Sequence, residues 1–299
     1  MKFTKFCLIL ILLFLIGCSS NNDKLIIGLI KPSLDHLPFG FGLEIGTLKA
    51  EDYKIRYFSS GWETNEALVS EKIDVAIMPF TYTWTDVSQG KKVKIISFME
   101  RESDGIITTK EIKNIQDLDG KKIGVLRAST LDIFAEMFLD ENNINMDLVY
   151  FRTPMDMATA LKSGEVDALS YYVPSIFKFD ENFHIIHWFS EKFPFHPCCD
   201  LSATEKAISD KKKKITKLIQ GLEKSVNGIN NNPAIAFDFA QISFYLQKEI
   251  AKQSLYHTKF VMGLAETGKL FEQKAVNKMI EKGYIVKPVK AEDVYFEIR

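Results

Sequence analysis

The residue types most able to do chemistry in this 299-residue chain lie in the stretch His196-Pro197-Cys198-Cys199-Asp200. Two thiols beside an imidazole are the components of a redox pair or of a metal site. However, adjacent cysteines close only a strained disulfide ring, and zinc normally takes four ligands at looped spacings. Neighbouring side chains of an extended strand also point to opposite faces. We therefore expect Cys198 and Cys199 to pack in the interior and to bind no metal.

No catalytic signature stands out elsewhere in the sequence. The chain has no Gly-rich phosphate loop with a following Lys, no Gly-x-Ser-x-Gly motif and no His-Glu-x-x-His motif. His184 and His187 are three residues apart, but no third metal ligand is suggested nearby. We expect no catalytic residues and no cofactor, and hence a protein that is not an enzyme.

Aromatic and hydroxyl side chains gather where the predicted strands end. Loops are normally polar and exposed, so this aromatic content is typical of a small-molecule pocket with a few polar anchors. Phe41 and Phe80 are better explained as core residues, whereas the hydroxyl-rich surroundings of Trp62, Tyr82 and Trp84 favour binding. The candidate ligand-binding residues are Asp35, His36, Phe39, Trp62, Thr81, Tyr82, Trp84, Ser129, Thr130, Tyr171 and Tyr172.

Two of these candidates, Ser129 and Thr130, stand directly before a predicted helix. The free N–H groups and the dipole of a helix N-terminus favour an anion such as a carboxylate, sulfonate or phosphate. Simple capping of the helix explains the two hydroxyls equally well and does not exclude the first interpretation. Arg127 could pair with such an anion or lie on the surface, and His36 beside Asp35 is a hydrogen-bonding candidate.

The elements that must position these residues form an internal repeat. The sequence IRYFSS at 55–60 matches LVYFRT at 148–153, and ALVSEKID at 67–74 matches ALKSGEVD at 160–167, both at an offset of 93 residues. Upstream, IGLI at 27–30 matches IGVL at 123–126 at an offset of 96. Three matches in the same order predict two lobes built on one plan.

Each lobe is predicted to contain strand, helix, strand, helix and strand. Residues 25–30 and 122–126 are short apolar runs, as expected for buried parallel strands, and 75–78 and 168–171 are the third strands. Leu131, Phe134, Ala135 and Phe138 recur at helical spacing. Alternating strands and helices predict parallel sheets covered by helices. Ligands of such sheets bind beyond the carboxyl ends of the strands.

The C-terminal third is predicted to be helical. Helices occupy residues 210–260, with a break at the NNNP of 230–233, and a last helix near 270–282 ends at Gly283. The tail at 284–299 is predicted to form a short strand and a turn. Because the second lobe is already complete, we expect this part to pack on the first lobe.

The N-terminus predicts export. Lys2 and Lys5 form a positive segment before the apolar run 6–16, and the sequence LIGC at 15–18 resembles a bacterial lipobox. Residues 1–17 would then be a lipoprotein signal peptide, Cys18 the lipidated N-terminus and 18–23 a flexible tether. The alternative is an ordinary secretory signal with an incidental cysteine. We expect a cell-membrane protein, anchored by lipid on the extracytoplasmic side.

Composition excludes several classes of protein. With 46% hydrophobic and 26% charged residues, the chain is neither disordered nor fibrous. A formal net charge of −1 provides no basic field for a nucleic acid. The longest apolar run, 6–17, is shorter than the roughly 20 residues that a membrane-spanning helix needs.

These motifs resemble a known family, the substrate-binding proteins of ABC importers of the aliphatic-sulfonate, nitrate and thiamine-precursor type. The most specific stretch is IQDLDGKKIGV at 115–125, which is similar to the start of that family's second lobe. Further similar segments are IDVA at 73–76, GEVDA at 164–168, HPCC at 196–199 and NNPA at 231–234. The segment 31–38 lacks the Trp often found in thiamine-precursor binders, so their pyrimidine-binding residues are not transferred.

The resemblance implies an α/β, two-lobed periplasmic-binding-protein type II fold. Each lobe would be a mostly parallel sheet flanked by helices, with crossover strands near 102–108 and 193–202 as the hinge. Residues 24–105 and 199–299 would form lobe 1, and residues 106–198 lobe 2.

The resemblance also implies a function and partners. The protein would be a monomer that delivers a small, aromatic or planar ligand, a thiamine-precursor pyrimidine or a sulfonate among the options, to an ABC permease and its ATPase. An anionic group on this ligand is one option. The alternatives are an enzyme of the same fold, similar to a pyrimidine synthase or a menaquinone-pathway enzyme, and a ligand-sensing lipoprotein that docks a receptor.

Overall fold

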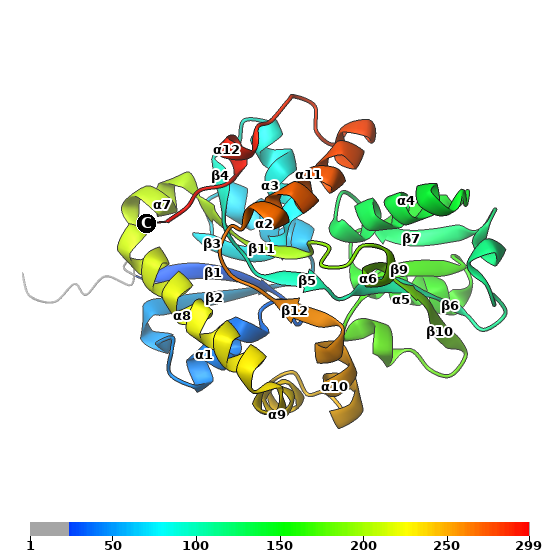
Figure 1. Ribbon diagram of the computed structural model, residues 1–299, viewed down its shortest axis with the longest axis horizontal. Coiled ribbons are helices and arrows are strands. Elements are labelled where there is room, and N and C mark those ends of the chain that lie inside the picture. Colours follow the sequence, from blue (N-terminus) through cyan, green and yellow to red (C-terminus); the bar gives the residue numbers. More distant parts are fainter. Residues whose placement is uncertain (1–23, 299) are drawn as a thin grey trace, which may run out of the picture.

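The computed structural model of the chain describes residues 24–298 (Figure 1). The predicted signal peptide, the lipidation site Cys18 and the tether lie outside the described residues. Among the helices formed by residues 24–298, none has the length and apolar character needed to cross a bilayer.

Two five-stranded sheets lie side by side, the first on the left and the second on the right of Figure 1. The first has the order β2-β1-β3-β11-β4 and the second the order β10-β6-β9-β7-β8. The strands of the first sheet are β1 Leu25–Ile30, β2 Tyr53–Phe58, β3 Val75–Pro79, β4 Val93–Phe98 and β11 Cys199–Thr204. Those of the second are β6 Asp104–Thr109, β7 Lys122–Leu126, β8 Asp147–Phe151, β9 Ala168–Tyr172 and β10 Phe183–Trp188.

The predicted repeat is confirmed by the register of the strands. Ile27 of β1 pairs in parallel with Ile55 and Val75, and its counterpart Ile123 of β7 pairs in parallel with Leu148 and Ala168. In each sheet one strand runs antiparallel to its neighbours, β11 in the first and β6 in the second. The fold is therefore α/β with two mostly parallel sheets on one plan, as the sequence predicts.

Helices flank both sheets. Those that accompany the first sheet are α1 Leu37–Glu44, α2 Gly61–Val69 and α3 Phe80–Ser88, with the short 3-10 helix η1 at Ala50–Asp52. Those that accompany the second are α4 Thr130–Asn142, α5 Pro154–Ser163 and α6 Phe189–Lys192, with η2 at Ile115–Leu118 and η3 at Ser175–Lys178. The periodic residues Leu131, Phe134, Ala135 and Phe138 are all buried on α4, which confirms the face predicted for this helix.

Two segments expected to be loops begin helices instead. The Ser60 side chain accepts a hydrogen bond from the Glu63 N–H, so this cap starts α2 at Gly61 and places Trp62 in its first turn. Helix α3 begins at Phe80, directly after β3. The aromatic residues of these segments consequently have directions fixed by a helix.

The C-terminal part is largely helical. Its elements are α7 Glu205–Asp210, α8 Lys212–Asn231, α9 Pro233–Ser243, α10 Lys248–Tyr256, β12 Thr258–Phe260, α11 Glu266–Glu281 and α12 Ala291–Val294. The expected break before Pro233 and the end of the last long helix near Gly283 are confirmed. The tail forms a helical turn and one β-bridge, Tyr295 with Ile95, rather than the expected strand and turn.

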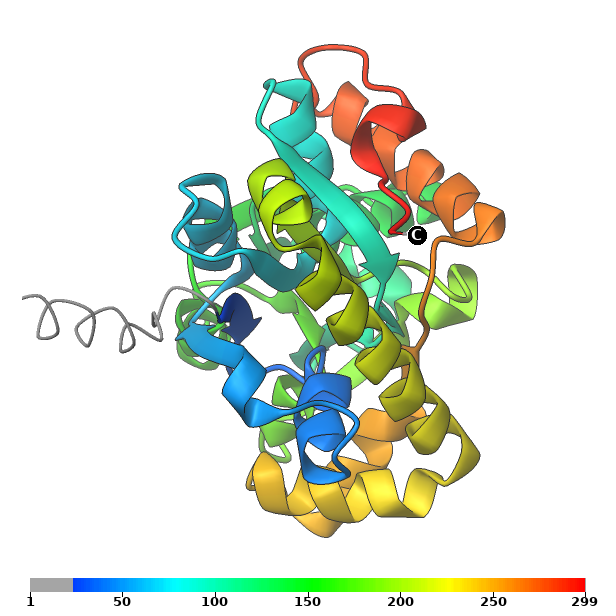
Figure 2. The ribbon, with the colours of Figure 1, turned by 90° about the vertical axis from the view of Figure 1, so that its left-hand side faces the viewer.

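The C-terminal part packs on both lobes, which corrects the expectation that it packs on the first. Figure 2 shows α8 crossing the first lobe, where it contacts α1. Helix α11 contacts α3 of the first lobe and α4 of the second. Its residues Ala275, Val276 and Met279 share one apolar cluster with Trp84 and Phe134, because α11 buries an apolar face between the two helices. Strand β12 pairs with β5, Glu100–Glu102, which lies between the sheets.

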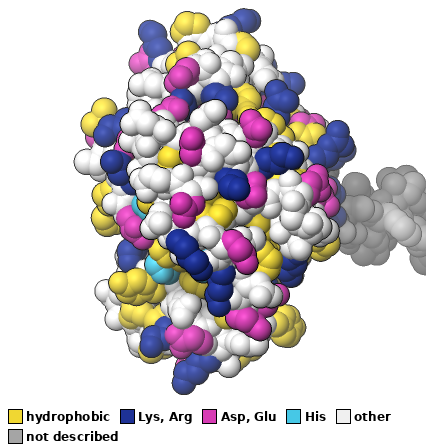
Figure 3. Space-filling view, turned by 90° about the vertical axis from the view of Figure 1, so that its right-hand side faces the viewer, with side chains coloured by type: hydrophobic (Ala, Val, Ile, Leu, Met, Phe, Trp, Pro, Cys, Tyr) yellow, Lys and Arg dark blue, Asp and Glu magenta, His cyan; other side chains and the backbone are white. Residues whose placement is uncertain are grey.

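The surface carries charges of both signs. Figure 3, which faces the end of the second lobe, shows lysine and arginine side chains interspersed with aspartate and glutamate. This face therefore offers no extended basic field.

Candidate functional site

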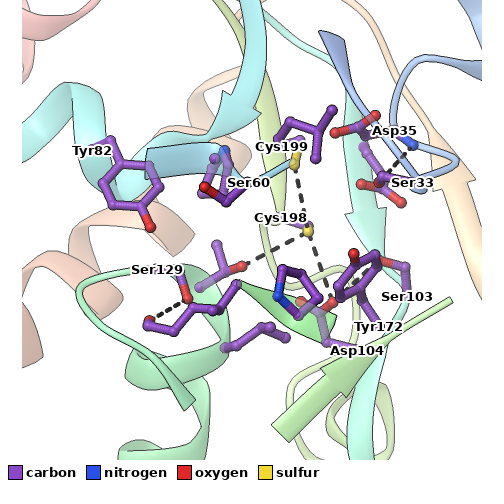
Figure 4. Close-up of a pocket in the computed structure, with 18 residues that line it drawn as sticks. Ser33, Asp35, Ser60, Tyr82, Ser103, Asp104, Ser129, Tyr172, Cys198 and Cys199 are labelled. Atoms are coloured by element: carbon purple, nitrogen blue, oxygen red, sulfur yellow. Dashed lines mark hydrogen bonds between the residues drawn. The ribbon is translucent and has the colours of Figure 1, made fainter. Parts of the chain in front are cut away.

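A cavity of about 50 Å³ lies between the two lobes (Figure 4). Its walls come from the segment after β1, the starts of α2 and α4, and the strands that connect the lobes. The lining residues are Ile30, Ser33, Asp35, Ser60, Gly61, Pro79, Tyr82, Glu100, Ser103, Asp104, Leu126, Ser129, Thr130, Leu131, Pro154, Tyr172, Cys198 and Cys199. Five of the eleven sequence candidates therefore meet here, namely Asp35, Tyr82, Ser129, Thr130 and Tyr172.

Asp35 is a fully buried carboxylate contributed by the first lobe. One of its oxygens, Oδ1, lies 2.9 Å from His36 Nδ1, and its backbone N–H donates to Ser33 Oγ at 3.3 Å. The other oxygen, Oδ2, finds no hydrogen-bond partner within residues 24–298. A buried acceptor without a donor is costly, so this oxygen is available to a ligand.

Asp104 is the corresponding carboxylate at the start of β6, on the second sheet. The Ser103 hydroxyl donates to its Oδ1 at 3.4 Å, whereas Oδ2 has His196 Nε2 at 3.8 Å and no hydrogen-bond partner among the described residues. Glu100 on β5 is the third carboxylate of the cavity. Burial raises the pKa of Glu100 and of Asp104, because water no longer stabilises the ionised forms.

The two cysteines both line the cavity, which corrects the expectation that they point to opposite faces. Strand β11 begins at Cys199, so Cys198 precedes the regular strand, and the two sulfur atoms lie 3.8 Å apart. Both thiols are free and buried. Their sulfur atoms and a Glu100 carboxylate oxygen lie within 4.8 Å of one another, which is a geometry that could hold a metal ion. Burial raises the pKa of Cys199 well above its ordinary value and so disfavours the thiolate that metals bind.

The start of α4 forms the wall opposite β11. Ser129 is the N-cap residue, but its hydroxyl donates to the Leu126 carbonyl at 2.6 Å and makes no cap hydrogen bond, contrary to the expected capping role. Instead, Asp132 Oδ2 accepts from the Ala128 N–H at 2.7 Å. The Thr130 hydroxyl lies 3.8 Å from Cys198 Sγ across the cavity.

Two tyrosines complete the polar lining. The Tyr82 hydroxyl donates to the Arg127 carbonyl at 3.4 Å and thereby joins α3 of the first lobe to the segment before α4 of the second. The Tyr172 hydroxyl finds no hydrogen-bond partner within residues 24–298. A hydrogen bond between the lobes therefore lies at the cavity, whose wall retains polar groups without a partner among the described residues.

Several candidates lie elsewhere. Phe39 packs in the core of the first lobe with its ring edge-on to Tyr53, and Thr81 is fully buried away from the cavity. Trp84 is 0% exposed and packs edge-on against Tyr295. Phe39 and Trp84 therefore belong to the hydrophobic core, and none of the three residues lines the cavity.

Three further candidates lie near the cavity without lining it. His36 stands behind Asp35, and the Tyr171 hydroxyl donates to the Pro154 carbonyl at 2.8 Å. Trp62 is 50% exposed and lines a second, outer hollow of about 490 Å³ together with Tyr150, Arg127 and others. This outer groove shares Ser60, Tyr82 and Leu126 with the cavity and so adjoins it.

Sequence reasoning missed the carboxylates and thiols of the connecting strands. Glu100, Asp104, Cys198 and Cys199 were not among the binding candidates. One signal was available: the polar stretch ERESD at 100–104 interrupts two apolar strand runs at the predicted crossover. Charged residues at a buried crossover are unusual and point to a site.

Three comparisons place the chain among known proteins. A sequence profile described as NMT1/THI5 like matches residues 42–236. No curated protein sequence matches the chain.

Solved structures show the same fold over nearly the whole chain. The periplasmic aliphatic sulphonate binding protein SsuA from Escherichia coli has a TM-score of 0.76 at 14% identity, with 93% of each chain covered. The ligand-binding component of an ABC-type import system from Staphylococcus aureus, with zinc bound, has a TM-score of 0.80 at 17% identity, covering 92% of this chain and 97% of that one. The alkanesulfonate-binding protein SsuA from Xanthomonas axonopodis pv. citri, bound to MOPS, has a TM-score of 0.77 at 15% identity, covering 93% and 99%.

Proposed function

Because this chain belongs to the NMT1/THI5-like family, we propose that it is an extracytoplasmic solute-binding protein that holds a small molecule between its two lobes. The observation that supports this proposal most directly is the cavity, whose wall combines residues of both lobes. Three buried polar atoms of this wall, Asp35 Oδ2, Asp104 Oδ2 and the Tyr172 hydroxyl, have no hydrogen-bond partner within residues 24–298. A ligand in this position contacts both lobes only when they are closed, so its binding free energy favours the closed form.

The proposed site comprises Asp35, Tyr82, Ser129, Thr130 and Tyr172, with Glu100 and Asp104 added from the structure. Lobe 1 would consist of 24–105 and 199–299, and lobe 2 of 106–198, with the connecting strands as the hinge. The protein would be lipidated at Cys18, act as a monomer and present the closed form to an ABC permease and its ATPase.

The proposal predicts that the exported full-length protein, purified without denaturation, retains one small molecule. Native mass spectrometry should show a mass excess that disappears on denaturation, and the released compound should rebind unchanged. Thr130→Phe places a bulky ring in the cavity and should reduce binding of the released compound at least tenfold.

Thr159→Phe provides the matched control, because Thr159 is exposed on α5. This variant should bind as the unmodified protein does. Full retention of the compound by a folded Thr130→Phe variant would contradict the proposed site. Conversion of the compound into a product during incubation would favour the enzyme alternative.

A further inference from the structure

The cavity is acidic, and its acidity is not balanced by cations in its wall. Three carboxyl groups line it, those of Asp35, Glu100 and Asp104. Within residues 24–298, no lysine, arginine or histidine lines it. Asp35 follows β1 of the first sheet and Asp104 begins β6 of the second. Figure 4 shows Asp35 on the side of Cys199 and Asp104 on the side of Cys198.

The neighbouring cations are directed elsewhere. The Arg101 guanidinium adjoins Glu100 in sequence but donates to Asp200 at 2.9 Å and to Glu272 at 3.1 Å. Arg127 lies in the outer groove, with its guanidinium 5.7 Å from the centre of the Tyr150 ring. These side chains therefore do not neutralise the acidic wall.

The histidines behind the wall also leave acceptors free. His36 contacts Asp35 Oδ1, while Asp35 Oδ2 stays without a partner among the described residues. His196 approaches Asp104 Oδ2 no closer than 3.8 Å, which is beyond hydrogen-bonding distance. Two fully buried carboxylate oxygens are therefore open to a donor that the described part of the chain does not supply.

The N-terminus of α4, which forms part of the wall, does not make the cavity favour anions. A helix N-terminus favours anions through its free N–H groups and dipole. In α4, however, Asp132 in the first turn accepts from the Ala128 N–H and places a carboxylate at that end. An anionic ligand would meet three buried carboxyl groups at short range, and each of them that is ionised repels it.

We propose that the ligand is a small organic cation, a protonated amine or amidine, whose N–H groups donate to Asp35 and Asp104 across the cleft. This inference rests on the proposed function and names the class of solute. Charge-assisted hydrogen bonds to buried carboxylates are among the strongest available to a ligand, and Ile30, Leu126 and Leu131 would contact its carbon atoms. The volume of about 50 Å³ favours a compact molecule, because one water needs about 10–15 Å³ on this measure.

The test uses probes that differ in charge and hardly in shape. The full-length protein, freed of bound solute by dialysis, is titrated calorimetrically with acetamidine, acetamide and acetate, and then with benzamidine, benzamide and benzoate. We expect the amidine of at least one series to bind at least tenfold more tightly than its amide and its carboxylate. Asp35→Asn and Asp104→Asn should each remove this preference, because an amide keeps the shape of the carboxylate and loses its charge.

Asp238→Asn, at an exposed position of α9, is the control and should change nothing. Both cavity variants keep the shape of the side chain and change an oxygen that has no hydrogen-bond partner among the described residues, so they are expected to fold. Tighter binding of acetate or benzoate, or of propane-1-sulfonate, would overturn the inference and leave the proposed function standing. Binding of Zn²⁺ with indifference to both amidines would also overturn it. Failure of every probe, together with no retained solute in the native mass spectrum, would contradict the proposed function itself.

Discussion

Replacement of Arg101 by methionine is expected to lower the free energy of unfolding by about 3–5 kcal/mol at pH 7, since it leaves buried carboxylates without their cation. The Arg101 guanidinium lies between Asp200 on β11 and Glu272 on α11. All three side chains are almost completely buried. The Tyr295 hydroxyl donates to the same Glu272 carboxylate at 2.6 Å. This cluster therefore joins the connecting strands to the C-terminal part.

The loss of stability should depend on pH. Burial raises the pKa of Asp200 and Glu272, and the charge of Arg101 opposes that rise. Without Arg101 both pKa values rise further in the folded state, while those of the unfolded chain stay near their ordinary values. At a pH below the ordinary pKa values of Asp200 and Glu272, both carboxyl groups are protonated in the folded and the unfolded state. The variant is then not destabilised by buried carboxylates. As the pH rises above these pKa values, the unfolded chain ionises first, so the variant loses stability progressively toward pH 7.

Urea denaturation followed by circular dichroism, between pH 4 and pH 7, measures this effect. Adding Asp200→Asn and Glu272→Gln to the Arg101→Met variant should restore most of the stability at pH 7. Lys206→Met, which breaks the exposed pair with Asp210, should leave the denaturation midpoint unchanged. If Arg101→Met unfolds at the same urea concentration as the unmodified protein at pH 4 and at pH 7, the cluster does not stabilise the fold.

Trp84→Ala is expected to lower the free energy of unfolding by about 3–5 kcal/mol, because it leaves a large cavity in the core. Trp84 is fully buried, packs edge-on against Tyr295 and directs its indole N–H toward Glu272 at 3.5 Å. Trp62→Ala is the matched control at a half-exposed position of the outer groove and should change stability by less than about 0.5 kcal/mol.

Equilibrium unfolding of both variants decides whether the two tryptophans have the roles that the structure assigns. Trp84→Phe should recover part of the loss, because it refills much of the site without supplying the N–H. Equal effects of Trp62→Ala and Trp84→Ala on stability would contradict the placement of Trp84 in the core. The two stability predictions are coupled through Glu272, so each variant is measured in an otherwise unmodified chain.

The architecture could be predicted from the sequence because its signals are local and repeated. The offset matches at IRYFSS and LVYFRT correspond to β2 and β8 in equivalent registers, and the apolar spacing of α4 gives its buried face. The helical C-terminal part was predicted, but its packing on both lobes was not. That packing depends on which face α11 presents to α3 and α4, and periodicity does not specify the partner of an apolar face.

The site was predicted less completely for a physical reason. Tyr82 and Trp84 stand two residues apart in one aromatic segment, yet α3 directs the first to the cavity and the second into the core. The carboxylates come from positions 35, 100 and 104 and meet only after the lobes fold and pack. The sequence therefore shows which residue types are present. Which charged groups share one cavity depends on the tertiary structure.

The two lobes are expected to close on a small molecule. Nitroxide labels at Glu66→Cys on α2 and Met155→Cys on α5 lie at exposed positions of the first and second lobes. They are attached while the solute is retained, because Cys198 and Cys199 are buried in this closed form. Pulsed electron–electron double resonance measures the distance between the two labels. It is recorded for the protein with its retained solute, after dialysis, and after the solute is added back. We predict that the distance between the labels lengthens or broadens on dialysis and returns on re-addition, and that Thr130→Phe abolishes the return. An identical distance distribution in all three states would contradict the account.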